Sequence, residues 1–397
     1  MLLEILLFLF IGILFGIITG LSPGIHINLV GAILVSLSFS VFSEISQIYL
    51  VVFIVSMSIT HTFVDFIPSI FLGCPNSDTE LSVLPGHQLL KEGLGYQAVI
   101  LSATGCLTGI FALAILSVPL SVFIEKIYPI IKSSIPWILI GICLFMIFSE
   151  RKKFSAVVVI ILTGILGYCV LNMNLEEPLL PLLGGLFGSS MILLSIKQNT
   201  FIPEQKTEFE KIERKKFVKP FLSAILSSPL CGFLPGVGSG QAAVIGSQIS
   251  KTDEKQFLFL LGVVNSFVMG ISFISLYSIA KSRTGSAVAI QQIIGNVDEK
   301  ILLLIIIVCL LSGIISFFVT KFIAKKFINL VQKVDYSKIS KVVLLILIIV
   351  TLIFSEIIGL LILIISTLTG IYCISLGVKR THMMGCLLIP TIILYLL

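Results

Sequence analysis

Small, helix-breaking residues stand beside polar side chains at two points that lie 212 residues apart in the sequence. The first is the stretch GLSPGIHINL at 20–29, and the second is GFLPGVGSGQ at 232–241. A helix that begins just after Pro-Gly directs unpaired backbone N–H groups, and the positive end of its dipole, toward whatever binds there. The repeated pattern therefore predicts an anion site that needs no lysine or arginine.

The candidate solute-binding residues come from both stretches. Glycine permits close approach of the backbone to a ligand, and proline can begin a helix without wasting an N–H donor. The expected site residues are Ser22, Pro23, Gly24, His26 and Asn28 from the first stretch, and Pro235, Gly236, Gly238, Ser239 and Gln241 from the second. For either stretch alone, the alternative is an ordinary loop in which Pro-Gly caps a helix.

One acidic residue lies deep inside a long apolar segment. Asp65 follows His61 by four residues, which places both side chains on one face of a helix. Ionisable residues inside membrane segments are rare and functional by default, so we expect this pair to form a coupling site for H⁺ or Na⁺. The alternative is a hydrated carboxylate at a helix break before Pro68. His87 and Gln291, at corresponding places in the two halves of the chain, are additional candidates.

Other kinds of chemistry lack the residues they need. The eight cysteines are scattered, with no CxxC pair and no histidine at metal-ligand spacing, so we expect small core residues and no metal site. Four histidines and one deep acid offer neither a nucleophile with its base nor a pair of aspartates. An intramembrane enzyme is kept as an alternative, and no cofactor is expected.

The elements that must position these residues are membrane helices. Hydrophobic residues make up 57% of the 397 residues and charged residues 12%, whereas soluble domains contain about 45–50% and about 25%. The segment from Met1 to Thr19 has no basic region and no cleavage site, so we expect a retained first span. The composition predicts an all-α, multi-pass protein of the cell membrane.

Fourteen apolar segments follow one another along the chain, and some are well short of the roughly 20 residues that a full span needs. The short segments 29–43, 220–232 and 240–250 are expected to be half-helices or re-entrant arms. Segments 342–354 and 357–377 are expected to cross separately. The prediction is therefore roughly 10–14 membrane segments with broken or re-entrant helices.

Basic residues set the expected orientation in the membrane. All 26 lie outside the apolar segments, and with alternating crossings 21 of them fall on one side and five on the other. Basic loops remain in the cytoplasm, so we place the 21 inside and both termini outside. This bias accounts for the positive charge, and no nucleic-acid partner is expected.

The chain divides into two halves of similar order. Residues 1–196 form the predicted first membrane repeat, 197–219 a solvated cytoplasmic linker, and 220–397 the second repeat. THTFVDFIPSIFL at 60–72 aligns loosely with VNSFVMGISFISL at 264–276, in the same order as the Pro-Gly stretches. Seven segments lie on each side of the linker, and an odd number forces the halves into opposite orientations. We expect two inverted repeats, an arrangement common in secondary transporters, with broken helices meeting near the bilayer midplane.

The sequence resembles the large membrane subunit of tripartite tricarboxylate transporters, the TctA family, and especially a branch of shorter archaeal homologues. Besides the Pro-Gly stretches, the matching residues are Gly73 and Pro75 of a G-x-P element, and Lys91, Gly93 and Ala98 of a K-x-G-x-x-x-x-A tail. Pro85-Gly86-His87 stands where the family has an Asp-Gly-Tyr-type turn. Because this replacement changes side chains near the expected site, a tricarboxylate is not carried over as the solute.

The resemblance implies a permease for a small organic anion of the carboxylate class, with H⁺ or Na⁺ as coupling ion. It also implies two partners, a small membrane subunit and an extracytoplasmic solute-binding protein, besides the surrounding membrane lipid. Related inverted-repeat proteins that move polyprenyl-phosphate lipids would use the same helix-end chemistry. Transport of such a lipid head group is therefore the alternative function.

Overall fold

The computed structural model describes residues 2–22, 31, 34–35, 44–73, 79–173, 175, 178–197, 203–207, 213–233, 238–281, 284–333 and 336–396, and its regular elements are all helical. Seven of these helices are long and apolar enough to cross a membrane, and four shorter apolar helices accompany them. The chain is an integral, multi-pass membrane protein, as its composition predicts.

The helices follow one another in two groups separated by the linker. The first group is α1 (Leu2–Leu21), α3 (Gln47–Val64), α4 (Phe66–Leu72), η1 (Glu80–Ser82), α5 (Val83–Lys91), α6 (Gly95–Lys132), α7 (Ile135–Phe148), α8 (Lys153–Leu171), α9 (Leu179–Leu183), η2 (Gly184–Ser189) and α10 (Ser190–Lys197). The second group is η3 (Arg214–Phe217), α11 (Val218–Phe233), α12 (Ser239–Ser250), α13 (Glu254–Ile279), α14 (Gly285–Ile294), α15 (Glu299–Lys333), α16 (Tyr336–Ser375), η4 (Arg380–Met384) and α17 (Gly385–Leu396).

Two helices differ from the segments that hydropathy marks. α16 covers both segments expected to cross separately, but it is kinked between them, where Glu356 leaves the helical region with φ 53° and ψ −158°. A charged residue lowers local hydropathy, which is why the pattern indicates a loop there. α14 has no predicted counterpart, because its ten residues include Ser286, Gln291 and Gln292. The short segments 220–232 and 240–250 become α11 and α12, of 16 and 12 residues.

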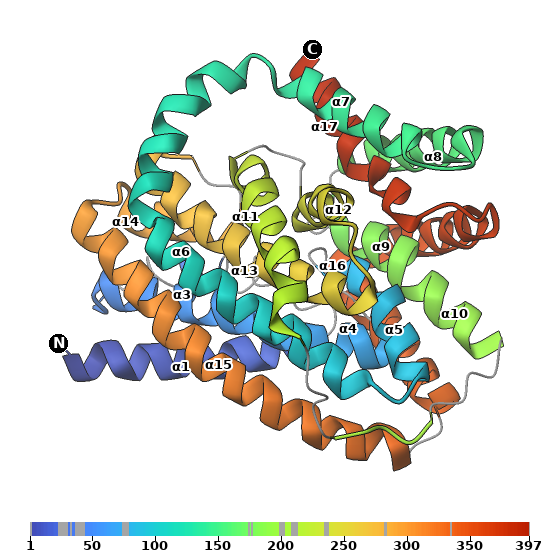
Figure 1. Ribbon diagram of the computed structural model, residues 1–397, viewed down its shortest axis with the longest axis horizontal. Helices are drawn as coiled ribbons and strands as arrows, with labels where there is room; N and C mark the ends of the chain where they lie inside the picture. The colour runs from blue at the N-terminus through green and yellow to red at the C-terminus, as the bar shows by residue number, and fades with distance from the viewer. Residues whose placement is uncertain are drawn as a thin grey trace.

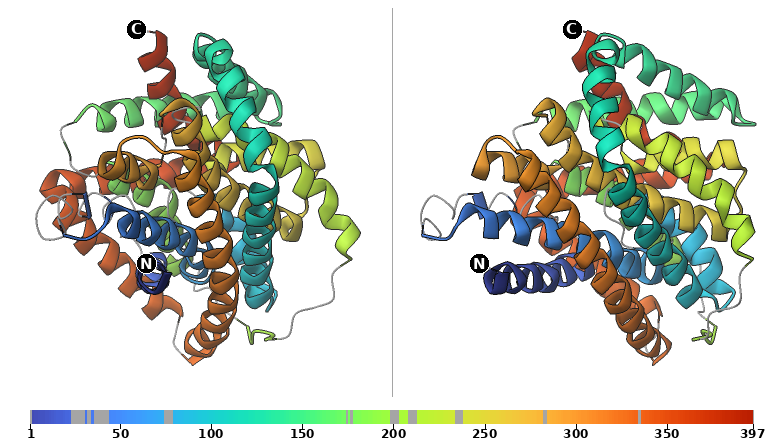
Figure 2. Two further views of the ribbon diagram at one scale, coloured as in Figure 1. Left: turned by 90° about the vertical axis from the view of Figure 1, so that its left-hand side faces the viewer. Right: turned by 60° about the vertical axis from the view of Figure 1, so that its left-hand side comes forward.

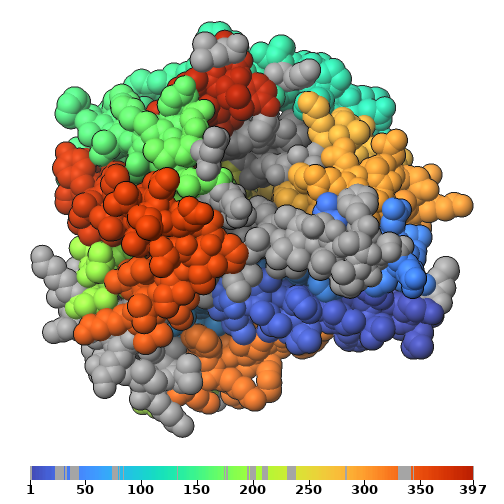
Figure 3. All heavy atoms as spheres, turned by 180° about the vertical axis from the view of Figure 1, so that it is seen from behind, coloured from blue at the N-terminus to red at the C-terminus, as the bar shows by residue number. Residues whose placement is uncertain are grey.

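Helices α3 and α13 form the core of the molecule (Figure 1). Every residue from Leu50 to Val64 and from Leu258 to Leu276 is buried. α1, α6 and α15 pack around α3, while α6 and α11 pack against α13, and the long α6 and α15 lie side by side across one side of the molecule (Figure 2). α1 and α16 lie at the surface of another face (Figure 3), where their exposed leucine, isoleucine and phenylalanine side chains suit contact with lipid.

Small residues let α6 and α13 touch backbone to backbone. A Cβ atom at Gly105 would lie 2.1 Å from a carbonyl oxygen of α13, and one at Gly262 would lie 2.1 Å from a carbonyl oxygen of α6. The Ser266 hydroxyl adds a hydrogen bond of 2.9 Å to the carbonyl oxygen of Cys106. Contacts of this kind hold membrane helices together, since hydrocarbon provides no hydrophobic drive for their association. This is the tightest junction between the two halves of the chain.

The same kind of contact joins α1 to α3. A Cβ atom at Gly12 would lie 2.0 Å from Oγ of Ser56, and one at Gly20 would lie 2.9 Å from Cβ of Val64. Contacting residue numbers rise together, so the two helices run parallel. The predicted segment 29–43, which lies between them in the chain, falls largely outside the described residues.

The helices of the two halves occupy matching places. α1 packs on α3 as α11 packs on α13, and α6 of the first half packs on α13 as α15 of the second packs on α3. In Figure 1, α3 runs from left to right and α13 from right to left. Such an exchange of partners is expected for inverted repeats. The relation itself, with its boundaries 1–196 and 220–397, stays a prediction.

Part of the linker 197–219 is packed against the protein. The Gly95 N–H donates to Oε1 of Gln205 at 2.9 Å, and Nε2 of Gln205 donates to the carbonyl oxygen of Leu90 at 2.8 Å. These backbone groups lie at the end of α5 and the start of α6, where a helix leaves donors and acceptors unpaired. Gln205 is consequently only 4% exposed. The expected solvated connector is thus anchored at this point, although those of its charged residues whose side chains the structure describes are exposed.

Replacing Gly105 or Gly262 with alanine should destabilise the protein, because each new methyl group would overlap a carbonyl oxygen and force α6 and α13 apart. Overpacking a tight core costs about 1–3 kcal/mol. Gly141 in α7 is the matched control, since a Cβ atom there meets nothing within 4 Å. Thermal unfolding in detergent measures the effect. Equal Tm values for Gly105→Ala and Gly141→Ala would contradict the close contact.

Candidate functional site

The buried ionisable pair lies where α3 meets α4. His61 and Asp65 are 3% and 1% exposed, and Nε2 of His61 lies 3.9 Å from Oδ2 of Asp65. The break expected before Pro68 amounts to one residue, since α3 ends at Val64, α4 begins at Phe66, and Asp65 between them keeps helical backbone angles of φ −64° and ψ −17°. Asp65 is nevertheless enclosed by protein. A carboxylate in this position needs a proton, a cation or polar partners to offset its desolvation.

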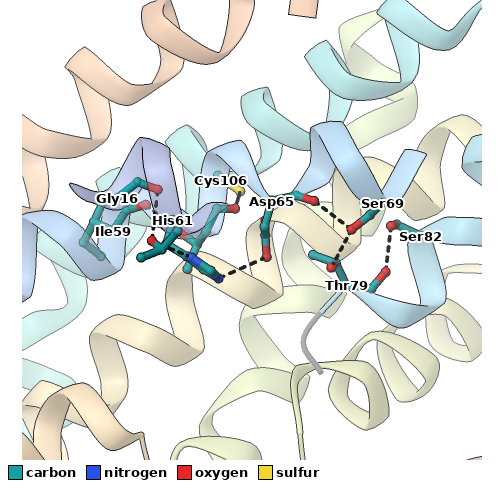
Figure 4. Close-up of polar contacts among 10 residues, drawn as sticks. Gly16, Ile59, His61, Asp65, Ser69, Thr79, Ser82 and Cys106 are labelled. Carbon is teal, nitrogen blue, oxygen red and sulfur yellow. Dashed lines mark hydrogen bonds and ion pairs between the residues drawn. The ribbon is translucent and has the colours of Figure 1, made fainter. Parts of the chain in front are cut away.

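Hydrogen bonds set the orientation of the His61 ring (Figure 4). Nδ1 of His61 lies 3.1 Å from Oγ1 of Thr19, whose hydroxyl donates to the carbonyl oxygen of Gly16 at 3.2 Å. Thr19 therefore accepts from His61, which assigns the ring proton to Nδ1 and directs Nε2 toward Asp65. The 3.9 Å separation suits an ion pair but exceeds a direct hydrogen bond. The pair can thus take up a proton at Nε2 or on the carboxylate.

A line of hydroxyl groups continues from Asp65 toward α5 (Figure 4). Oγ of Ser69 donates to the carbonyl oxygen of Asp65 at 2.7 Å and lies 2.8 Å from Oγ1 of Thr79. Oγ of Ser82 donates to the carbonyl oxygen of Thr79 at 2.7 Å. All three hydroxyl residues are buried. Polar groups therefore connect the ionisable pair with the end of the stretch 73–79.

The described beginning of the first Pro-Gly stretch lies beside the ionisable pair. A Cβ atom at Gly20 would lie 3.2 Å from the backbone nitrogen of Asp65. Ser22 follows the end of α1, is half-buried, and donates its N–H to the carbonyl oxygen of Ile18 at 3.1 Å. The rest of the predicted site in this stretch lies outside the described residues, namely Pro23, Gly24, His26 and Asn28.

The second stretch leads directly into α12, which begins at Ser239. Ser239 and Gln241 are buried, and the Gly238 N–H donates to Oε1 of Gln241 at 2.6 Å. Nε2 of Gln241 has no hydrogen-bond partner in the part of the chain that the structure describes. A buried donor without an acceptor costs about 1–3 kcal/mol, which a bound anion or water would relieve. Pro235 and Gly236 lie outside the described residues, and the meeting of both stretches in one cavity stays a prediction.

Two buried amides add polar groups to the core that hydropathy does not single out. Gln97 of α6 lacks hydrogen-bond partners for both side-chain polar atoms, and Asn265 of α13 lacks one for Nδ2, as far as the described residues extend. The only hint was in the alignment of the two halves, which places Asn265 opposite His61. Cys106 of α6, bonded to the carbonyl oxygen of Thr62, ties these helices to α3.

His87 lies in positive surroundings at the end of α4. A Cβ atom at Gly73 would lie 2.9 Å from Cε1 of His87, and Gly73 adopts φ 68°, the left-handed conformation that suits glycine after a helix. Burial, together with the charges of Lys91 and Arg380, lowers the pKa of His87 to about 4. The imidazole is therefore neutral at physiological pH, and two cations near it favour an anion. Arg380 precedes the last apolar segment, and no sequence pattern marks it.

Gln291 has a structural role. Its Nε2 donates to the carbonyl oxygen of Ala280 at 3.1 Å, which closes the connection between α13 and α14. Across the described ranges, no three histidine, cysteine or acidic side chains gather closely enough to hold a metal ion. The candidate groups among the described residues are thus one ionisable pair, buried amides and hydroxyls, and a cationic region.

Comparison with known proteins extends over nearly the whole chain. Residues 6–385 match the tripartite tricarboxylate transporter TctA family. The chain is also similar to an uncharacterised protein of Methanocaldococcus jannaschii, with 32% identity over 406 positions that cover 98% of this chain and 99% of the relative. No solved structure matches. The family match includes both Pro-Gly stretches, the His61–Asp65 pair and Arg380.

Replacing Gln97 with leucine should stabilise the protein, because it removes buried polar atoms that lack partners, by about 1–3 kcal/mol. The same change at Gln205, whose amide is fully bonded to backbone groups, should destabilise it. Thermal unfolding of the two variants provides the comparison. A fall in Tm for Gln97→Leu as large as that for Gln205→Leu would mean that Gln97 is a structural residue.

His87 should make the protein less stable in acid. Its pKa is lowered from 6.5 to about 4 on folding, so the unfolded chain takes up the proton first and stability falls as pH drops from 6.5 toward 4. In His87→Asn, the fall in Tm over this range should be smaller. Tm measured at half-unit pH steps provides the test, and identical profiles for both proteins would contradict it.

Proposed function

Because the chain belongs to the tripartite tricarboxylate transporter TctA family, we propose that this membrane transporter carries a small organic anion of the carboxylate class, coupled to an ion. Members of the family are transporters, which excludes the intramembrane enzyme. The observation that carries the finer proposal is the buried His61–Asp65 pair, which lies beside the end of α1 where the first Pro-Gly stretch begins.

Electrostatics connects this pair to an anionic solute. An ionised Asp65 in a low-dielectric core repels a carboxylate that binds nearby. A proton on the pair, or a cation at the Asp65 carboxylate, removes the repulsion. Ion and solute then favour each other's binding, and such coupling is reciprocal and typically about 1–3 kcal/mol. We therefore propose symport, in which the ion and the anion bind together and are released together.

The anion site itself is proposed to include Ser22 and the residues that follow α1, with Gly238, Ser239 and Gln241 at the start of α12. The unpaired Nε2 of Gln241 and the start of α12 support this placement, since both offer donors to an anion. Lys91 and Arg380 supply positive potential near His87. This potential concentrates an anion in the protein without a direct ion pair that would slow its release.

The accessory proteins are proposed on the strength of the family. Its tripartite description supports a small membrane subunit and an extracytoplasmic solute-binding protein as partners of this chain. The family name also points to tricarboxylates, but Pro85-Gly86-His87 changes the surroundings of the site. We therefore propose a carboxylate without specifying its number of charges. A polyprenyl-phosphate head group, the alternative, would use the same helix-end donors.

Asp65→Asn should abolish ion-driven uptake while leaving the protein folded, because it removes the charge that couples ion to anion. Proteoliposomes with an imposed pH or Na⁺ gradient, assayed with labelled citrate and succinate, measure the uptake. Glu356→Gln is the control, since Glu356 is an exposed acid within another helix that is long and apolar enough to cross the membrane. The gradient that drives uptake by the unmodified protein identifies the ion.

Several outcomes would decide against this scheme. Gradient-driven uptake that is unchanged in Asp65→Asn would remove the pair from the coupling mechanism. If Glu356→Gln loses as much uptake as Asp65→Asn, the loss reflects the removal of any carboxylate from a membrane helix and is not specific to the pair. If carboxylates are not transported and a polyprenyl phosphate is, the alternative function holds.

A further inference from the structure

A large apolar cavity lies at the side of the helical core. Its volume is about 1110 Å³, and α6, the start of α11, α13 and the end of α15 line it. This volume is slightly above the usual range of about 300–1,000 Å³ for small-molecule pockets. None of the residues of the proposed transport site lines it. Its occupant is therefore a separate question from the transported solute.

The walls of the cavity are mostly apolar and suit a hydrocarbon chain. Five phenylalanines lie among its lining residues: Phe111, Phe217, Phe221, Phe259 and Phe317. The rings of Phe217 and Phe259 meet edge to face at 5.2 Å and join η3, just before α11, to α13. The hydroxyls of Thr104 and Thr108 donate to carbonyl oxygens of their own helix, at 2.7 and 2.9 Å. The walls therefore leave few polar groups for a polar ligand.

Two cations, Arg214 and Lys321, complete the lining, and no acidic residue accompanies them there. Both are exposed, and neither has an ion pair or hydrogen bond with any described residue. They belong to the two most basic segments of the chain, 197–219 and 321–341, which the distribution of basic residues places on the cytoplasmic side. The anchoring of Gln205 holds the linker nine residues before Arg214. The cavity is thus apolar with a positive edge at the inner membrane surface.

We propose that this cavity binds a membrane lipid with an anionic phosphate head group. The hydrocarbon chain lies among the phenylalanines, and the phosphate lies against Arg214 and Lys321. A neutral apolar ligand would carry no charge to pair with the two cations, and a soluble anion would make no apolar contact with the walls. Basic pockets between helices on the cytoplasmic side are suited to such head groups. The lipid would join α6 of the first half to α11, α13 and α15 of the second.

The test adds phosphatidylglycerol or phosphatidylcholine with identical chains to delipidated, detergent-solubilised full-length protein, and follows Tm. Phosphatidylglycerol should raise Tm more than phosphatidylcholine. In the double variant R214Q/K321Q, the affinity for phosphatidylglycerol should fall roughly tenfold or more. The double variant K325Q/K326Q removes the same charge from exposed positions of α15 that do not line the cavity, and should respond as the unmodified protein does.

A second variant tests the walls without changing charge. Ala112→Trp fills the cavity from α6 and should reduce the response to phosphatidylglycerol while Arg214 and Lys321 stay in place. Glycerol phosphate, the head group alone, should leave Tm unchanged. The proposal is overturned if phosphatidylcholine acts as strongly, if glycerol phosphate acts equally well, or if K325Q/K326Q loses as much affinity as R214Q/K321Q. An unchanged response in Ala112→Trp would also overturn it.

Discussion

The backbone contact between α6 and α13 is the interaction on which the rest of the structure depends. Lipid provides no hydrophobic drive between helices, so association depends on close packing, and Gly105 and Gly262 bring carbonyl oxygens within reach of the facing helix. One helix comes from each half, which makes this contact the junction between them. With α6 fixed in this way, α1, α6 and α15 together enclose α3. The enclosure keeps Asp65 away from lipid and water.

Side-chain hydrogen bonds also connect α3 to two helices of the second half. Ser58 bonds to Ser286 of α14 at 2.6 Å, and Thr60 accepts from Ser316 of α15 at 2.9 Å. α3 is therefore held by α1 and α6 of its own half and by α13, α14 and α15 of the other half. Any change in the charge of the pair at its end acts on α1 through Thr19 and on α4 through the chain itself. The ionisable pair thus lies at the end of a helix that contacts both halves of the chain.

Strong, local signals in the sequence predicted more of this molecule than weak, long-range ones. Asp65 is conspicuous because a carboxylate in an apolar run is costly and rare, and the start of α12 at Ser239 follows from Pro-Gly. The sequence pattern did not single out Gln97. One amide barely lowers the mean hydropathy of a long segment, and the burial of Gln97 depends on α13, which is distant in the sequence. Predicting the anchoring of Gln205 would have required knowing which backbone groups stay unpaired in the turn between α5 and α6. Glu356, which separates two apolar segments in the sequence, also marks a kink in the backbone of α16, because its φ of 53° and ψ of −158° lie outside the helical region.

The α6–α13 contact also has a consequence for how the protein is made. Ser266 is synthesised 160 residues after Cys106, its partner across the contact, and translation at about 5–20 residues per second makes that interval roughly 10–30 s. During this time α6 is in the membrane with its glycine face uncovered, and α3 carries an ionisable pair without its later neighbours from the second half. The nascent first half therefore depends on the insertion machinery to shield these surfaces. The glycine face of α6 thus stays without its partner until α13 has been synthesised.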